Sequence, residues 1–177
     1  MSWVPPPSYL PTLIGEGYEG SGVSAANIKV MLGDRNGPVG TAWATALATP
    51  TTGHEPFIVV ARPGLPVKPW TLFVNTVAIA GDDHGTLTVG AAHAGVAAGI
   101  IEAVGVGVLP PEPAESAVLI ASVWVDPAAS LVHQDVIFVN NRVATVAAIR
   151  SAIVGGPTLR EVMSDTGGVW NAAYHPS

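Results

Sequence analysis

The stretch ANIKVML at residues 26–32 determines the kind of fold that this sequence predicts. Apolar Ile28 and Val30 alternate in it with polar Asn27 and Lys29. Successive side chains of a strand point to opposite faces, so this period of two predicts a strand with one apolar face and one mixed face. The apolar face must be buried against other elements, so we expect the strand to belong to a sheet that packs against helices.

Further strands and helices are expected on both sides of this stretch. β-Branched and aromatic runs predict strands, and Ala-rich runs that begin near Asp or Thr and end near Gly or Pro predict helices. The expected strands are residues 9–17, 26–32, 57–61, 71–80 and 117–125, and the expected helices are residues 41–48, 82–106 and 131–153. This order predicts an α+β fold, in which helices pack on one side of the sheet.

The length of 177 residues predicts one main domain with a hydrophobic core. We expect an extended, proline-rich arm at residues 1–14, the domain at residues 15–154, and a polar tail at residues 155–177 that Trp170 and Tyr174 can anchor. Apolar residues make up 49% of the chain and charged residues only 11%. So few charges leave apolar surface to be buried between subunits, which favours a homo-oligomer.

The charge balance and the composition exclude several classes of function. The net charge of −6 and the lack of a basic patch argue against nucleic-acid binding. The absence of cysteine excludes disulfides, thiol nucleophiles and Cys-based metal sites. The start of the chain does not resemble a signal peptide, and the apolar residues 90–109, interrupted by His93 and Glu102, predict a buried helix and not a membrane span. We therefore expect a cytoplasmic protein without a membrane partner.

Two short motifs are rejected on physical grounds. Residues 15–20, GEGYEG, spell a dinucleotide fingerprint, but they precede a strand and carry two acids where phosphates would lie. Residues 82–84, Asp-Asp-His, are better explained as a helix start than as metal ligands, because adjacent side chains rarely point at one ion. No nucleophile elbow and no phosphate loop is present. We expect no metal.

Short stretches spread over residues 15–153 share their order and spacing with one enzyme family. They are Gly15-Glu16, Gly20-Ser21-Gly22, Ala26-Asn27-Ile28, Gly33-Asp34-Arg35, Thr41-Ala42-Trp43, residues 61–69, Asn75, Gly90, residues 107–110, Asn141 and Ala144-Thr145. In these stretches the chain resembles the formaldehyde-activating enzymes. The resemblance implies a ribosomal-protein-like β-α-β two-layer sandwich that assembles into a homopentamer. It also implies condensation of formaldehyde with tetrahydromethanopterin in a cleft between subunits, without a metal or a permanently bound cofactor.

The resemblance also places the family's functional positions on this sequence, and most of them carry other residues. The family histidine that acts as the acid falls on Asn27, and the aspartate two residues later falls on Lys29. The candidate catalytic residues are Asn27, Lys29 and His93, the last at the position of a pterin-contacting glutamine. The candidate substrate-binding residues are Ile58, Thr76, Ala78 and Lys68, of which Lys68 also suits a structural role at a subunit contact.

These replacements change the chemistry that the site can perform. Asn27 cannot supply a proton near neutral pH, and losing a general acid worth 10²–10⁴-fold costs about 3–5 kcal/mol of barrier. Lys29 reverses the local charge, but a lysine in a partly dry cleft can attack a carbonyl to form a Schiff base. His93 can act as an acid or a base, and Asn27 can donate a hydrogen bond to an oxyanion.

Simpler explanations exist for each of these residues, and three functions stay open. Lys29 also fits a solvated position, His93 a packing position and Asn27 a turn. The first function is an enzyme with an altered site that acts on a small molecule by carbonyl, lyase or cyclisation chemistry. The second is retained condensation of formaldehyde with tetrahydromethanopterin or a similar amine. The third is a non-catalytic module that binds a small molecule.

Overall fold

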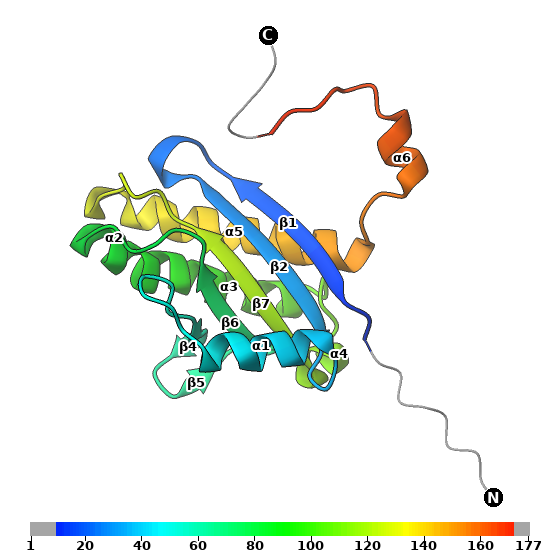
Figure 1. Cartoon of the computed structure of the whole chain (residues 1–177), viewed down its shortest axis with the longest axis horizontal. Coiled ribbons are helices and arrows are strands. Elements are labelled where there is room, and N and C mark those ends of the chain that lie inside the picture. The colour runs from blue at the N-terminus through cyan, green and yellow to red at the C-terminus, as the bar shows by residue number, and fades with distance from the viewer. Residues whose placement is uncertain (1–9, 172–177) are drawn as a thin grey trace, which may run out of the picture.

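A mixed sheet of five strands forms the centre of the protein. The computed structural model describes residues 10–171 (Figure 1). The strand order is β1 (Leu13–Glu19), β2 (Ala26–Asp34), β7 (Ala117–Trp124), β6 (Trp70–Asn75) and β3 (Phe57–Ile58). All neighbouring strands are antiparallel except β7 and β6, which run parallel. The predicted N-terminal arm up to residue 9 and the predicted anchor Tyr174 lie outside the described residues.

The alternation in residues 26–32 produces the two faces that it predicts. In β2 the side chains of Ala26, Ile28, Val30 and Leu32 are buried. The residues between them are half-buried or exposed, and Lys29 is exposed. The buried face joins the main hydrophobic core, which fixes the register of this strand.

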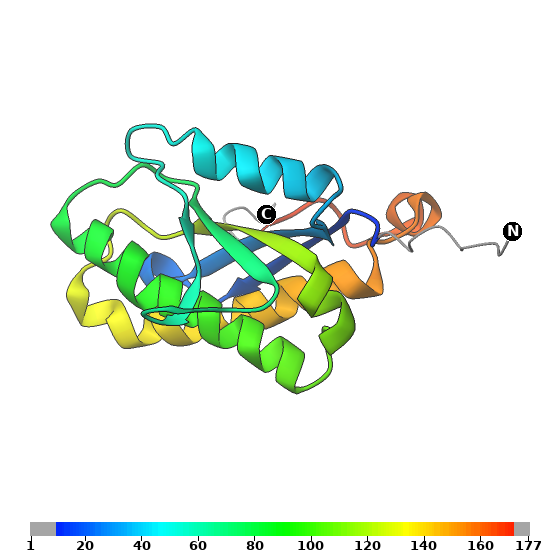
Figure 2. The same ribbon diagram turned by 90° about the horizontal axis from the view of Figure 1, so that it is seen from below.

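Two long helical segments cover this apolar face. One is α5 (Gln134–Val154), and the other runs through α2 (Asp82–Leu87), a π-helical segment at Thr88–Ala92 and α3 (His93–Gly105). Both lie on the same side of the sheet in Figure 2. The α+β class, with a mixed sheet packed against helices as in a two-layer sandwich, is confirmed.

The backbone of α5 lies unusually close to β1, because Gly15 and Gly17 face it. A Cβ atom at Gly15 would collide with the backbone of Ala148, and one at Gly17 would collide with the backbone of Ala144. Glycine is therefore required at both positions by the close approach of strand and helix.

Helix α1 (Pro38–Ala48) lies over the opposite face of the sheet, at one end only (Figure 2). Val39 of α1 packs against Gly33 near the end of β2. Helices thus lie on both sides of the sheet, although the sequence predicted them on one side. The part of the second face that α1 leaves uncovered carries the candidate site.

Several predicted elements differ in their bounds. The apolar run at residues 57–61 is not one strand, because the Val59 amide donates a hydrogen bond to the Thr71 carbonyl and the Val59 carbonyl accepts one from the Val67 amide. Val59 thus divides the run between two sheets. The result is β3 in the main sheet and β4 (Val60–Arg62), which pairs with β5 (Leu65–Pro66) in a separate hairpin.

Two short helices were not predicted. They are α4 (Pro111–Ser116), within the proline-rich loop, and α6 (Leu159–Ser164), within the tail. The N-terminus of α6 is closed by a capping box in which the Thr158 and Glu161 side chains bond to each other's backbone amides.

The helical segments Asp82–Gly105 and Leu131–Val154 are long and apolar enough to cross a membrane by length and composition alone. The structure explains this composition differently. In the most apolar window of each segment, 50% and 44% of the residues are buried inside the protein. Most of the buried apolar residues belong to the main core, so both segments are core helices of the α+β domain.

Candidate active site

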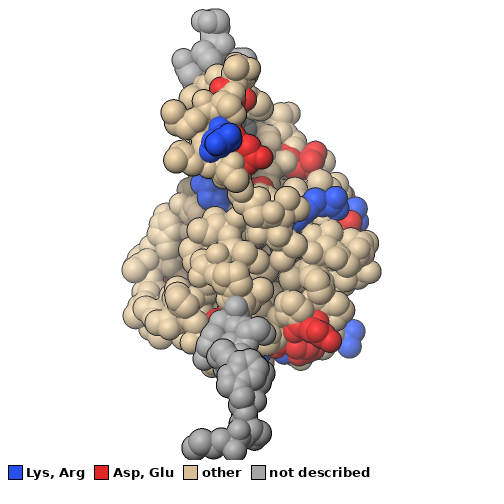
Figure 3. Space-filling view, turned by 90° about the vertical axis from the view of Figure 1, so that its right-hand side faces the viewer, with Lys and Arg blue, Asp and Glu red and all other residues tan. Residues whose placement is uncertain are grey.

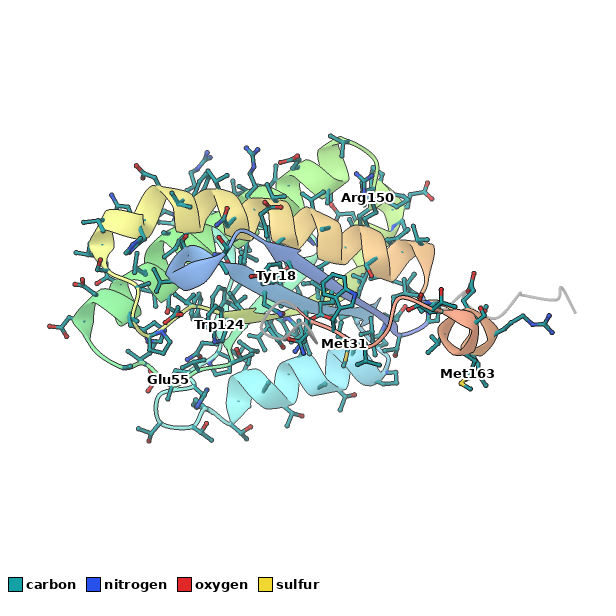
Figure 4. The ribbon with its side chains drawn as sticks, turned by 90° about the horizontal axis from the view of Figure 1, so that it is seen from above. Tyr18, Met31, Glu55, Trp124, Arg150 and Met163 are labelled. Atoms are coloured by element: carbon teal, nitrogen blue, oxygen red, sulfur yellow. The ribbon has the colours of Figure 1, made fainter. Side chains whose placement is uncertain are left out.

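The open face of the sheet carries two rows of polar and aromatic residues. In one row Tyr18, Asn27 and Trp124 lie opposite one another on β1, β2 and β7. In the next row the corresponding positions are Glu16, Lys29 and Ser122. These residues alternate with the buried ones, so the pleat that builds the core also points them to the other side. Figure 4 shows Trp124 and Met31 on the side of the sheet that faces α1.

A cavity of about 600 Å³ lies over these rows. Its lining includes one cation, Lys29, and two acids, Glu16 and Asp126. It also includes uncharged polar and aromatic side chains, namely Tyr18, Asn27, Thr76, Ser122, Trp124 and Asn171. The size suits a small molecule, and the mixture of a few charges with aromatic walls is typical of ligand pockets.

Two lining residues are held in place by hydrogen bonds to the backbone. Asp126, just after β7, accepts a hydrogen bond from the Ala128 amide at 2.8 Å through its Oδ1 atom. Thr76 follows β6 and donates its hydroxyl hydrogen to the Val123 carbonyl at 3.2 Å. Both side chains are therefore oriented before any ligand binds.

Lys29 has no carboxylate partner within the described part of the chain. The ion pairs found among residues 10–171 are Lys68–Glu115 at 3.1 Å and Arg142–Glu102 at 3.3 Å. The Cα atom of Lys29 lies directly opposite that of Glu16, but their charged ends form no ion pair. The amine of Lys29 is thus available to a ligand in the cavity.

His93 lies on the other side of the sheet from Lys29. Its Nε2 atom accepts a hydrogen bond from the Val60 amide at 3.1 Å, and its Nδ1 atom lies 3.2 Å from the Val89 carbonyl. Its ring packs edge-on against Phe57, with the ring centres 5.1 Å apart. Burial lowers the pKa of His93 below its ordinary value. The neutral ring, with hydrogen on Nδ1, satisfies both neighbours.

The predicted catalytic trio is therefore not assembled within one protomer. Asn27 and Lys29 lie together on the cavity floor, but the sheet separates them from His93. His93 is on the buried side of the sheet because it begins α3, which packs on that side. Its ring contacts Phe73, a residue that pairs with Ala121 and is buried in the core. The catalytic role of His93 remains a prediction that depends on a second subunit.

The four predicted substrate-binding residues occupy different places. Thr76 lines the cavity. Ala78 lies beside Gly53 in the loop after β6, and Ile58 lies on the edge strand β3 with 38% of its surface exposed. Lys68 precedes the start of β6, at the opposite end from Thr76, and pairs with Glu115. The structure thus brings Thr76 together with Asn27 and Lys29, but not the other three.

Sequence reasoning missed most of the lining. Glu16 and Tyr18 appeared in a rejected dinucleotide motif and Glu16 also in the family resemblance, but neither was assigned to the site, although their alternation with Gly15 and Gly17 indicates a shared face. Ser122 and Trp124 alternate in the same way with buried residues of β7. Asn171, in the tail, also lines the cavity, and no local sequence pattern predicts this position.

The sequence model of the formaldehyde-activating enzyme family matches residues 14–173, which include the strands of the cavity and the helices behind them. The chain belongs to this family. A 5,6,7,8-tetrahydromethanopterin hydro-lyase from Methanosarcina barkeri is 36% identical to it over 167 residues, which are 94% of this chain and 90% of that protein. The predicted membership in the formaldehyde-activating enzyme family is confirmed.

Two bifunctional relatives in the formaldehyde-activating enzyme family are much longer. The Bifunctional enzyme Fae/Hps from Methanococcoides burtonii is 39% identical over 153 residues, and its counterpart from Archaeoglobus fulgidus is 34% identical over 163 residues. These alignments cover 86% and 92% of this chain. The chain spans 38% and 40% of the length of these relatives.

Proposed function

We propose that this member of the formaldehyde-activating enzyme family joins a small aldehyde to the nitrogen of an amine co-substrate, using an altered set of catalytic groups. The observation that carries the proposal is the grouping of Lys29 with Glu16 and Asp126 in one cavity. Asn27 and Lys29, at the predicted positions of the family acid and its aspartate, form part of the same floor. Tetrahydromethanopterin or a similar cyclic amine is the co-substrate that the hydro-lyase relative suggests.

Different cavity residues can polarise the aldehyde, transfer protons and bind the ring of the co-substrate in such a condensation. Asn27 can donate a hydrogen bond to the carbonyl oxygen of the aldehyde, which polarises the carbonyl group. Glu16 and Asp126 can accept and return the protons that move when the C–N bond forms and water leaves. Tyr18 and Trp124 flank Asn27 across the strands and offer flat surfaces to a ring.

The active form in this proposal is a cytoplasmic homo-oligomer, a pentamer by resemblance. The surface supports association, because the face in Figure 3 carries few charged groups. The outward side of α5 and of the residues before it also exposes a row of valines: Val132, Val136, Val139 and Val143. A neighbouring subunit that covers such a row gains apolar burial. The row and His93 lie on the helical side of the sheet and the cavity lies on the other side, so His93 can contribute only to the cavity of a neighbouring subunit.

The proposed division of the chain places the domain at residues 15–154, with residues 1–14 before it and residues 155–177 after it, although β1 already begins at Leu13. Asn171 supports a role for the tail in completing the cavity.

One observation favours a second function, a non-catalytic module that binds a small molecule. No histidine among residues 10–171 lines the cavity, so a proton donor that titrates near neutral pH is missing from it in the single protomer. A cavity of this kind can hold a ligand without transforming it.

The experiment that tests the proposal is a direct assay of formaldehyde condensation with tetrahydromethanopterin, followed by absorbance of the methylene adduct. We expect a rate above the spontaneous one, and a loss of the added rate in Asp126→Asn. No acceleration, together with calorimetric binding of tetrahydromethanopterin, would instead establish the binding module. The absence of both acceleration and binding would reject both functions for this co-substrate.

A further inference from the structure

The chain contains only two lysines, Lys29 and Lys68, and the fold gives them opposite surroundings. The Nζ atom of Lys68 lies 3.1 Å from Glu115 Oε2 and 4.7 Å from the centre of the Trp70 ring. The carboxylate and the aromatic face hold the Lys68 side chain outside the cavity, away from a ligand bound there. Lys29 has no such carboxylate partner within residues 10–171. The fold thus leaves one lysine available for chemistry, and that lysine lies in the cavity.

The position of Lys29 in the sheet directs its side chain at a ligand. Lys29 lies on β2, between Glu16 of β1 on one side and Ser122 of β7 on the other. Side chains stand roughly perpendicular to a sheet, so this side chain rises from the cavity floor between two polar neighbours. Asn27 precedes it by two residues and therefore points to the same side. A carbonyl compound in the cavity meets an amine, a carboxylate and an amide together.

We propose that Lys29 captures a small aldehyde covalently, as an imine. The lone pair of Nζ forms a bond to the carbonyl carbon while the π electrons of the carbonyl move to its oxygen. Nζ loses a proton and the oxygen gains one, which gives a carbinolamine. The hydroxyl group then takes up a proton and leaves as water while the nitrogen lone pair forms the C=N bond, and Nζ loses its second proton. One amine and one aldehyde give one imine and one water, so no oxidant or reductant is needed.

The neighbours of Lys29 supply the proton transfers that these steps require. Glu16, directly across the strand pair, can accept the proton that Nζ loses. Asp126, in the same cavity, can return a proton to the departing hydroxyl group. Asn27 can hold the carbonyl oxygen by a hydrogen bond while charge develops on it. The protonated imine is more electrophilic than the hydrated aldehyde, so capture also activates the carbon.

Transfer of the captured carbon rests on the proposed function. The nitrogen of the amine co-substrate adds to the imine carbon, and its proton passes to Nζ. The lone pair of that nitrogen then forms a C=N⁺ bond while the bond from the carbon to Nζ breaks, and Nζ takes up a second proton, which frees Lys29 as the amine. The aldehyde must be small and unhindered, because its carbon becomes attached near the floor of the cavity. Formaldehyde is the first member of this class to test.

The test uses the full chain, formaldehyde and cyanoborohydride, which reduces an imine to a stable N-methyl group. Peptide mass spectrometry then measures methylation of Lys29, of Lys68 and of the α-amino group in the same molecules. We expect Lys29 to be methylated at least about tenfold faster than Lys68, which corresponds to a barrier lower by about 1.4 kcal/mol. Lys68→Arg is the matched control, in which methylation of Lys29 continues. Equal methylation of all three amines overturns the proposal.

A second arm separates this inference from the proposed function. Lys29→Arg keeps the positive charge but cannot form the imine, and circular dichroism verifies that it is folded. Full condensation activity in this variant, without a trapped adduct in the unaltered chain, overturns covalent capture and leaves the proposed condensation standing. Selective trapping at Lys29 without any acceleration of condensation supports capture and rejects the proposed condensation. Loss of both the adduct and the added rate in Lys29→Arg supports both.

Discussion

Glu16 and Lys29 lie directly opposite each other across the β1–β2 ladder, on the face of the sheet that α1 leaves open. The strand register places this acid and this base opposite each other in the cavity, yet they form no ion pair. A salt bridge would neutralise both groups. Without it, the carboxylate can accept a proton and the amine can meet a ligand, and the first prediction follows from this arrangement.

Glu16→Gln should slow the formation of the Lys29 adduct by about one to two orders of magnitude, because the amide cannot accept the amine proton. The measurement is the rate of methylation of Lys29 with formaldehyde and cyanoborohydride. Glu112→Gln, an exposed substitution on α4 outside the cavity, is the matched control and should leave that rate unchanged. Equal rates in the two variants would show that Glu16 has no part in the proton transfer.

Asn27→His should return a group that donates protons near neutral pH to the position that the resemblance assigns to the family acid. We expect the condensation rate with tetrahydromethanopterin to rise by about 10²–10⁴-fold. The added rate should fall as the pH increases through about 6.5, the ordinary pKa of histidine. Asn27→Gln keeps the amide and should show neither change. A folded Asn27→His variant without a gain would place the acid of this protein elsewhere.

His93 should make the protein less stable in acid. Burial lowers the pKa of His93 in the folded protein, so the unfolded chain binds the proton more readily. The stability that neutral His93 provides is present above about pH 6.5 and is lost as the pH falls through the lowered folded-state pKa. Urea unfolding between pH 7.5 and pH 5 measures this loss, which His93→Gln should reduce.

The same position separates a structural role from a catalytic one. His93→Leu leaves the Val60 amide without its acceptor and should cost about 1–3 kcal/mol at pH 7.5. Gln can keep an acceptor for that amide, so His93→Gln should retain most of this stability. If a neighbouring subunit brings its His93 to the cavity, as proposed, turnover should be abolished in a folded His93→Gln variant. Unchanged turnover would leave His93 with a structural role only.

Gly17→Ala should destabilise the fold by about 3 kcal/mol, because the added methyl group collides with the backbone of α5 at Ala144 and has no flexible neighbour to displace. Gly105→Ala is the control: its Cβ would meet nothing within 4 Å, and it replaces glycine in a helix. That change should be neutral or stabilising by up to about 1 kcal/mol. The free energy of unfolding in urea tests both, and equal values would contradict the close approach of β1 and α5.

The sequence predicted the parts of the fold that depend on local periodicity. The alternation in β2, the helix start at Asp82 and the last long helix are all present. The prediction of one strand at residues 57–61 was wrong because Val59 forms hydrogen bonds with two different partners. Periodicity does not indicate a change of partner within an apolar run. The position of α1 was missed because a pattern shows which residues share a face, but not which face a later helix covers.

The candidate site was predictable only in part, for a related reason. Asn27, Lys29 and Thr76 are found in the cavity, two of them because they share the mixed face of a single strand. His93 and Lys68 belong to other elements, and their places depend on how those elements pack. Glu16 and Trp124 come from β1 and β7, and only the pairing of these strands with β2 makes them neighbours of the predicted residues.

Strand β1 has a structural face and a cavity face. Gly15 and Gly17 on the structural face lie against the backbone of α5, and Glu16 and Tyr18 on the other face line the cavity. The glycine face tolerates almost no change, whereas the cavity face contributes little to the core and is free to vary. A scaffold of this kind can exchange its reactive side chains one at a time without refolding. Laboratory evolution of new aldehyde chemistry in this protein should therefore begin at positions 16, 18, 27 and 29, with the glycines left untouched.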